Sequence, residues 1–199
     1  MDLERLGNNA SAIINMFKNV FNTPMGIDLK KTLLYASGLA GYACHQVVKI
    51  NKEPYELVKT VDGKNFYMGD SVNKYLLGGR YSILSFCDGF FQSFGNGGIC
   101  PDPVNIVRNT TSAIGNNDYK IWNEYLPQNV YIEINKCWNG IFNNMIAKYC
   151  ESPEEWPVLF AIVLQKVMIM ASKMVSPAEL YRMSLECAVY ISKMDNDSI

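Results

Sequence analysis

The sequence predicts a predominantly helical α+β fold, a compact bundle of about seven helices with one small β-hairpin at about residues 56–68. Apolar residues recur at steps of three and four through most of the chain, which is typical of amphipathic helices. Polar cap residues followed by proline mark several helix starts, whereas only one stretch alternates in the manner of paired strands. At 199 residues the chain has the length of one domain, so we expect residues 1–199 to form a single unit.

Two long helices are predicted in the first quarter of the chain. Residues 3–21 carry apolar side chains on one helical face, and residues 22–26, which include Pro24 and Gly26, end this helix. Asp28 is the expected N-cap of a second helix that runs to about Ile50. Small residues repeat every four positions along it, at Ala36, Ala40 and Cys44. Because small side chains let a neighbouring backbone approach closely, we expect this helix to be the central one.

The hairpin is predicted from two alternating stretches, residues 56–61 and 64–68, on either side of Asp62-Gly63. An Asp-Gly pair between β-forming residues is typical of a two-residue type I′ turn. That turn would set Lys59 opposite Phe66. Because an isolated two-stranded ribbon is only marginally stable in water, it must pack on the helices or gain strands from another chain.

The remaining elements are predicted to be helical. A short helix covers about residues 72–77, and residues 81–94 are apolar over so broad a face that we expect them to be largely buried. Asp102-Pro103 opens a helix that runs to about Ile114, and residues 129–149 show helical spacing. Ser152-Pro153 and Ser176-Pro177, each followed by glutamate, start the last two helices.

Composition and charge exclude several classes of function. The formal net charge is −1 and no basic run exceeds two residues, so we expect no nucleic-acid partner. The most apolar stretch, residues 158–175, is interrupted by Gln165, Lys166 and Lys173, so we expect no membrane span. The six cysteines lack metal-binding spacing and the first residues lack the apolar core of a secretion signal. We therefore expect reduced thiols, a cytoplasmic location, and neither a metal nor a cofactor.

The first functional hypothesis is a non-enzymatic interaction or regulatory module that self-associates, most simply as a homodimer. On a helical wheel, Val158, Ile162 and Ile169 fall between the polar residues of their helix. A row of aliphatic side chains rimmed by polar groups on the solvent side of a helix is typical of an interface with a second copy or another protein partner. The uncovered edge of the hairpin favours the same interpretation. The alternative is that the protein's own fold buries the whole helix.

The second hypothesis, from a different class, is a small-molecule-binding protein or enzyme. Its pocket would lie near Tyr42, Cys44, His45, Arg80 and Asp88, with the glycine-flanked turns at Gly69 and Gly78-Gly79 as its mouth. His45 is the single histidine, but no carboxylate lies one helical turn away to orient it, so a structural role competes with a catalytic one. Asp88 falls in a segment predicted to be buried and needs a partner, for which Arg80 is the candidate.

Overall fold

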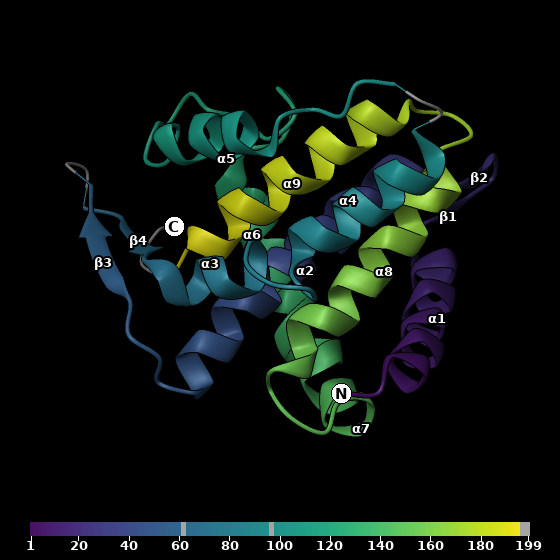
Figure 1. Ribbon diagram of the computed structural model, residues 1–199, viewed down its shortest axis with the longest axis horizontal. Helices are drawn as coiled ribbons and strands as arrows, with labels where there is room; N and C mark the ends of the chain where they lie inside the picture. Colours follow the sequence, from purple (N-terminus) through teal and green to yellow (C-terminus); the bar gives the residue numbers. More distant parts are fainter. Residues whose placement is uncertain (61–62, 96–97, 196–199) are drawn as a thin grey trace.

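The computed structural model describes residues 1–60, 63–95 and 98–195, and within these residues it has nine α-helices, one short π-helix and two small hairpins (Figure 1). The predominantly helical α+β fold is therefore confirmed, with two more α-helices than the sequence predicts. The helices are α1 (Leu3–Val20), α2 (Leu29–Ile50), α3 (Asp70–Leu76), α4 (Ile83–Phe94), α5 (Pro103–Ser112), α6 (Pro127–Cys137), η1 (Trp138–Phe142), α7 (Asn143–Tyr149), α8 (Glu155–Ala171) and α9 (Pro177–Lys193). The strands are β1 (Asn22–Thr23), β2 (Gly26–Ile27), β3 (Glu56–Lys59) and β4 (Asn65–Met68), paired β1 with β2 and β3 with β4.

The core is built around α2, which packs against both α8 and α9. Fifteen of its 22 residues are buried, so it is the central helix that its small residues predict. The closest approach is to α9, where a Cβ added at Gly41 would lie 2.1 Å from the carbonyl oxygen of Ala188. Only glycine allows the two backbones to cross at this distance.

Three of the predicted helix starts are confirmed by a capping side chain, whereas Ser152 does not cap α8, which begins at Glu155 without a side-chain cap. The carboxylate of Asp28 accepts a hydrogen bond from the backbone N–H of Lys31 at 2.9 Å, and that of Asp102 accepts one from Val104 at 2.9 Å. Ser176 caps α9 in the same way. These side chains satisfy N–H groups that the first turn of a helix leaves unpaired.

The continuous helix predicted over residues 129–149 is wrong in one respect. It is divided into α6, a π-helical turn at Trp138–Phe142 and α7. A π-turn accommodates one extra residue within a helix. Gly140 is the weakest helix former in this turn, which is compatible with a departure from α-helical geometry. No proline or cap residue in the sequence indicates the π-helical turn.

The hairpin forms at the predicted place, but its predicted register is wrong by one residue. Lys59 pairs with Asn65 and Val58 with Phe66. The backbone N–H of Thr60 bonds to the carbonyl of Lys64 at 2.9 Å, so Thr60 lies opposite Lys64, one residue earlier in the chain than a two-residue turn at Asp62-Gly63 requires. Gly63 has φ +91°, the left-handed value that short hairpin loops require at one position. The predicted type I′ turn also involves Val61 and Asp62, which lie outside the described residues.

The aliphatic row of α8 does not face solvent as predicted. Val158 and Ile162 are only 3% and 8% exposed, whereas Ile169 is 37% exposed. The reason is that α1, α2 and α4 all pack against α8, so the fold itself encloses most of this helix (Figure 1). Arg5 on α1 fixes the arrangement through two hydrogen bonds to the buried carboxylate of Glu155, at 2.7 and 2.8 Å.

Candidate functional site

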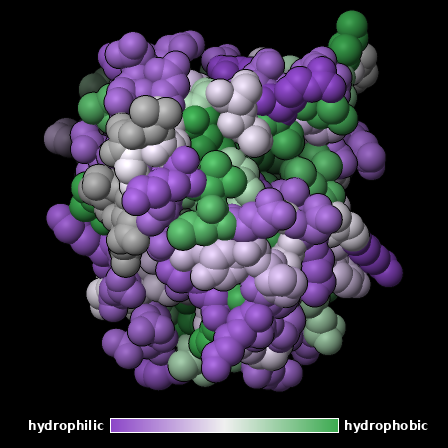
Figure 2. Space-filling model, turned by 90° about the vertical axis from the view of Figure 1, so that its left-hand side faces the viewer, coloured by the Kyte–Doolittle hydropathy of each residue, from purple (hydrophilic) through white to green (hydrophobic). Residues whose placement is uncertain are grey.

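An apolar cavity of about 710 Å³ lies between β4, α3, α4, α5 and the end of α9. Its size falls within the range of about 300–1,000 Å³ that is common for small-molecule pockets. Figure 2 looks onto the side of the molecule that carries the hairpin, and hydrophobic residues gather near the middle of this face between hydrophilic ones. The lining residues are Met68, Gly69, Asn73, Leu77, Leu84, Pro103, Val104, Val107, Arg108, Thr111, Ser112 and Lys193.

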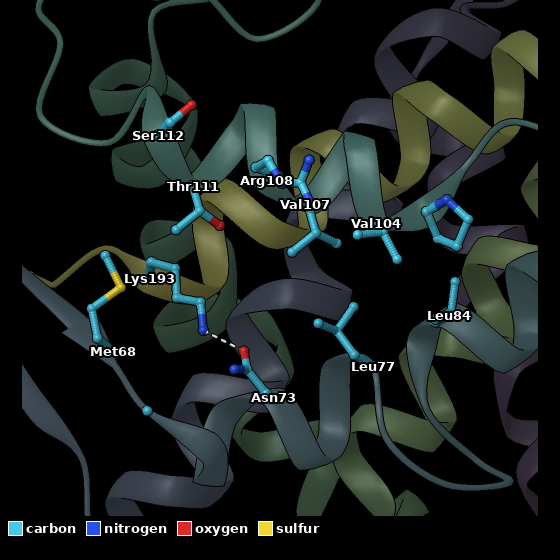
Figure 3. Close-up of a pocket in the computed structure, with 12 residues that line it drawn as sticks. Met68, Asn73, Leu77, Leu84, Val104, Val107, Arg108, Thr111, Ser112 and Lys193 are labelled. Carbon is cyan, nitrogen blue, oxygen red and sulfur yellow. Dashed lines mark hydrogen bonds between the residues drawn. The ribbon is translucent and has the colours of Figure 1, made fainter.

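One wall of the cavity is a face of α5. Val104, Val107, Arg108 and Thr111 stand at positions i, i+3, i+4 and i+7, which places them on the same side of a helix. Figure 3 shows Val104 and Val107 turned towards Leu77 from across the cavity. Val104 remains 59% exposed, so α5 carries an aliphatic face that no element of the described fold covers completely.

The opposite wall begins at Gly69, between β4 and α3. Gly69 has φ +118°, a value that L-residues with a side chain rarely adopt, and this bend redirects the chain from the hairpin into α3. Asn73 and Leu77 then follow four residues apart on one face of α3 and its C-cap. The margin of the cavity therefore includes a turn that depends on glycine. Gly69 is also one of the glycines that the sequence analysis expects at the mouth of a pocket.

Lys193 provides the polar end of the cavity. Lys193 is only 3% exposed, although it belongs to the last turn of α9. The Nζ atom donates a hydrogen bond to Oδ1 of Asn73 at 2.7 Å, drawn as a dashed line in Figure 3. Within the described part of the chain it forms no ion pair with a carboxylate.

Burial lowers the pKa of Lys193 to about 8, because a cation is poorly solvated in this position. The nearby Cys44 and Asp70 side chains oppose this effect only in part. Arg108 stands at the exposed rim as a second cation, and none of the described residues that line the cavity is acidic. The cavity thus combines aliphatic walls with positive charge.

None of the five residues predicted as a binding site lines the cavity at Lys193. Tyr42, Cys44 and His45 are buried in the middle of α2. Both ring nitrogens of His45 lack a hydrogen-bond partner among the described residues, and the ring lies 4.2 Å from that of Tyr67, centroid to centroid. Burial lowers the pKa of His45 to about 3. A neutral imidazole packed between aromatic rings fits the structural role considered above.

Arg80 and Asp88, the other two predicted residues, have different surroundings. The predicted partnership between them is wrong, since Asp88 accepts a hydrogen bond from the hydroxyl of Tyr181 at 2.6 Å. Arg80 is exposed, and its guanidinium lies 5.5 Å from the ring centroid of Tyr81. Neither residue lines the cavity at Lys193.

Sequence reasoning missed Lys193 because a lysine in the last turn of a helix is the usual partner of the helix dipole. The signal that could have found it is its position in the run Ala188-Val189-Tyr190-Ile191-Ser192-Lys193-Met194, where it is the single charge among mostly apolar residues. The spacing of Val104, Val107 and Thr111 was equally visible. The sequence alone does not predict that α3 and α5 lie close to the end of α9.

A second cavity, of about 560 Å³, lies where the start of α2 meets the junction of α8 and α9. Its cations are already paired, since Arg182 contacts Glu186 at 2.7 Å and Lys30 pairs with Glu124. Asp28 and Glu179 add negative charge. This cavity is therefore less suited to an anionic ligand than the one at Lys193.

Comparisons with family descriptions, with curated proteins and with solved structures gave no match to this chain. Across residues 1–60, 63–95 and 98–195, no helix combines the length and the apolar character needed to cross a membrane. The same residues contain no group of three or more His, Cys, Asp or Glu side chains placed to hold a metal ion.

Proposed function

We propose that the chain is a small-molecule-binding protein, and that its ligand has an aliphatic body and one anionic end, as in a medium-chain carboxylate. The observation that carries this proposal is a buried lysine at one end of a mostly apolar cavity, with no carboxylate partner among residues 1–60, 63–95 and 98–195. A buried cation is costly unless it is paired, so a ligand that brings a carboxylate to Lys193 gains from its charge as well as from its apolar chain.

The ligand would lie with its carboxylate near Lys193 and Asn73 and its chain along Val107 and Leu77. Arg108 at the rim would attract the anion on approach. This function is the second hypothesis of the sequence analysis, a small-molecule-binding protein, but the binding residues are different ones. We also propose a cytoplasmic location, because the six cysteines are free and would stay reduced there.

Calorimetric titration near pH 7 tests the proposal with decanoate as the probe. Decanol and decylamine are matched controls, because they keep the chain and replace the carboxylate by a neutral or a cationic group. We expect decanoate to bind at least about tenfold more tightly than either control, since one charge-assisted hydrogen bond is worth about 1.5–3 kcal/mol. Equal affinity for decanoate and decanol would contradict the proposal.

Two variants separate the charge from the cavity. Lys193→Met keeps an apolar side chain of similar length and should remove the preference for decanoate over decanol. It is not expected to unfold the protein, because it removes a buried charge. Val107→Trp should fill the cavity and weaken the binding of both ligands. Lys148→Met, at an exposed lysine of α7, is the control and should change neither.

A second candidate function is self-association through the hairpin. Every residue of β3 is exposed, including Leu57 at 52% and Val58 at 43%, and the sheet has no strand beyond β3 in the described part of the chain. An apolar edge strand of this kind can pair with a second copy. Light scattering over about a hundredfold range of concentration tests it: a dimer that Leu57→Lys dissociates would support the candidate, and a monomer at all concentrations would exclude it.

A further inference from the structure

Lys193 is the one buried lysine in the described part of the chain, whereas Lys166, which also donates to neutral acceptors, is only half-buried. Several of the other lysines carry the charge at an exposed position or against a carboxylate, as Lys49 does with Asp195 at 2.9 Å and Lys74 with Glu53 at 3.8 Å. Lys193 instead faces the cavity at the end of α9, and its hydrogen-bond acceptor is the neutral amide oxygen of Asn73. An amide oxygen can accept a hydrogen bond from a neutral amine as well as from an ammonium ion, so this contact does not require the charged form.

A lysine that is desolvated in an apolar pocket is the form of this side chain that reacts with carbonyl compounds. With a pKa of about 8, Lys193 is neutral in roughly a quarter of molecules at pH 7.5, against about one in a thousand for an ordinary lysine. The aliphatic walls of Leu77, Leu84, Val104 and Val107 would hold a hydrocarbon chain next to the amine and limit the access of water. The apolar cavity, the amine of Lys193 and the amide oxygen of Asn73 therefore lie next to one another.

We propose that Lys193 forms a reversible imine with aliphatic aldehydes bound in this cavity, so that the ligand class includes medium-chain aldehydes as well as carboxylates. This inference rests on the proposed binding function of the same cavity. The neutral amine of Lys193 attacks the aldehyde carbon, and a C–N bond forms as the carbonyl π bond opens. The carbinolamine then loses its oxygen together with the two amine hydrogens as water, which leaves the imine. No oxidant or reductant is needed, and hydrolysis returns the free aldehyde.

The side chain of Asn73 would have two roles in this reaction. Its Oδ1 atom holds the amine at 2.7 Å and so fixes the direction of attack. Its amide N–H₂ is a donor on the same group and would stabilise the carbinolamine oxygen. Asn73 is thus a positioning residue, and Asn73→Leu should slow imine formation while it leaves the aliphatic part of the cavity intact.

Trapping with a reductant tests the inference on the intact chain. The protein is incubated with decanal and cyanoborohydride near pH 7.5, and peptide mapping then gives the rate of alkylation at each lysine. We expect Lys193 to be alkylated at least about tenfold faster than Lys148, and excess decanoate to slow only Lys193. The N-terminal amine is followed as a separate peptide. Alkylation of Lys193 at the same rate as Lys148 or more slowly would overturn the inference.

Variants and the calorimetry above distinguish the possible failures. Val107→Trp, which keeps the amine and fills the cavity, should lose the rapid alkylation, and Lys193→Arg should show no rapidly alkylated lysine. If decanoate binds but Lys193 is not alkylated rapidly, the imine is excluded and the binding function stands. If Lys193 is alkylated rapidly but decanoate does not bind, the carboxylate ligand is excluded and the aldehyde stands. If neither occurs, both proposals fall.

Discussion

His45 and Lys193 are buried bases, and burial lowers the pKa of each, but the two groups have different surroundings. His45 is enclosed by its own fold, with the rings of Tyr42 and Tyr67 beside it and both nitrogens unpartnered among the described residues. Lys193 borders a cavity that an external molecule can enter. The same physical effect therefore gives a structural residue in one case and a candidate binding residue in the other.

Acid should destabilise the protein through His45. The histidine of the unfolded chain takes up a proton near pH 6.5, whereas the native one stays neutral until about pH 3. The unfolded state thus binds more protons in this window, and the free energy of unfolding falls by up to about 1.4 kcal/mol for each pH unit below 6.5. Lys49 and Lys193 favour the neutral imidazole and Asp195 opposes them.

The matched variant is His45→Phe, which keeps an aromatic ring and cannot be protonated. Urea unfolding of both proteins near pH 7 and pH 5 should show that the wild type loses about 2 kcal/mol more than the variant. Equal losses would mean that the native histidine is not held in its neutral form.

Binding of decanoate should weaken as the pH rises through about 8, because Lys193 then loses its charge while the carboxylate of the ligand stays ionised. Asp70 and Cys44, the other groups that act on Lys193, are present in both proteins compared. In Lys193→Arg the charge persists, so calorimetry at about pH 7 and pH 9.5 should give a flat affinity. A decline of the same size in this variant would assign the pH dependence to another group.

The contact of α2 with α9 depends on the absence of a side chain at Gly41. In Gly41→Ala the new methyl group would meet the backbone of Ala188 and the helices would have to separate, at a cost of about 3 kcal/mol or more. Gly7 in α1 is the control, since a Cβ there meets nothing within 4 Å. Gly7→Ala should raise the free energy of unfolding by about 0.5–1 kcal/mol. Denaturant unfolding of the two variants measures the difference, and similar effects would contradict the close crossing.

The elements that the sequence predicts well are those with local chemical signals. Asp28, Asp102 and Ser176 each bring a cap oxygen to the first turn of a helix, and such a cap depends on residues within three positions. The register of the hairpin depends instead on whether Thr60 and Lys64 pair across the turn, which shifts the pairing by one residue. The π-helical turn at Trp138–Phe142 has no local signal, because the geometry of a helix interior follows from what packs against it.

The three-dimensional arrangement decides which side of α8 is covered, and this could not be predicted from the helix itself. Its sequence is apolar on nearly all sides, and α1, α2 and α4, which pack against it, lie far from it in the sequence. The cavity at Lys193 has the same origin, since β4, α3, α4, α5 and α9 all contribute to it. Long-range contacts of this kind are not encoded in any one segment.

Glutamate substitutions in α8 should now have different effects at two positions. Ile162→Glu would place a charge at a position that is only 8% exposed and should cost on the order of 3–5 kcal/mol. Ile169→Glu, at a position that is 37% exposed, should change stability by about 0.5 kcal/mol or less. Thermal unfolding of both variants checks this, and a stable, folded Ile162→Glu protein that has lost a dimer would restore the interface predicted from the sequence.

The location of the ligand can be observed by NMR, through nuclear Overhauser effects between the chain protons of bound decanoate and methyl groups of the protein. If the cavity at Lys193 is the binding site, the contacts will be with Leu77, Leu84, Val104 and Val107, and Lys193→Met will abolish or weaken them. Contacts with Val175 and Leu180 would place the ligand in the second cavity, and the absence of any contact at millimolar decanoate would contradict a binding function for this part of the fold.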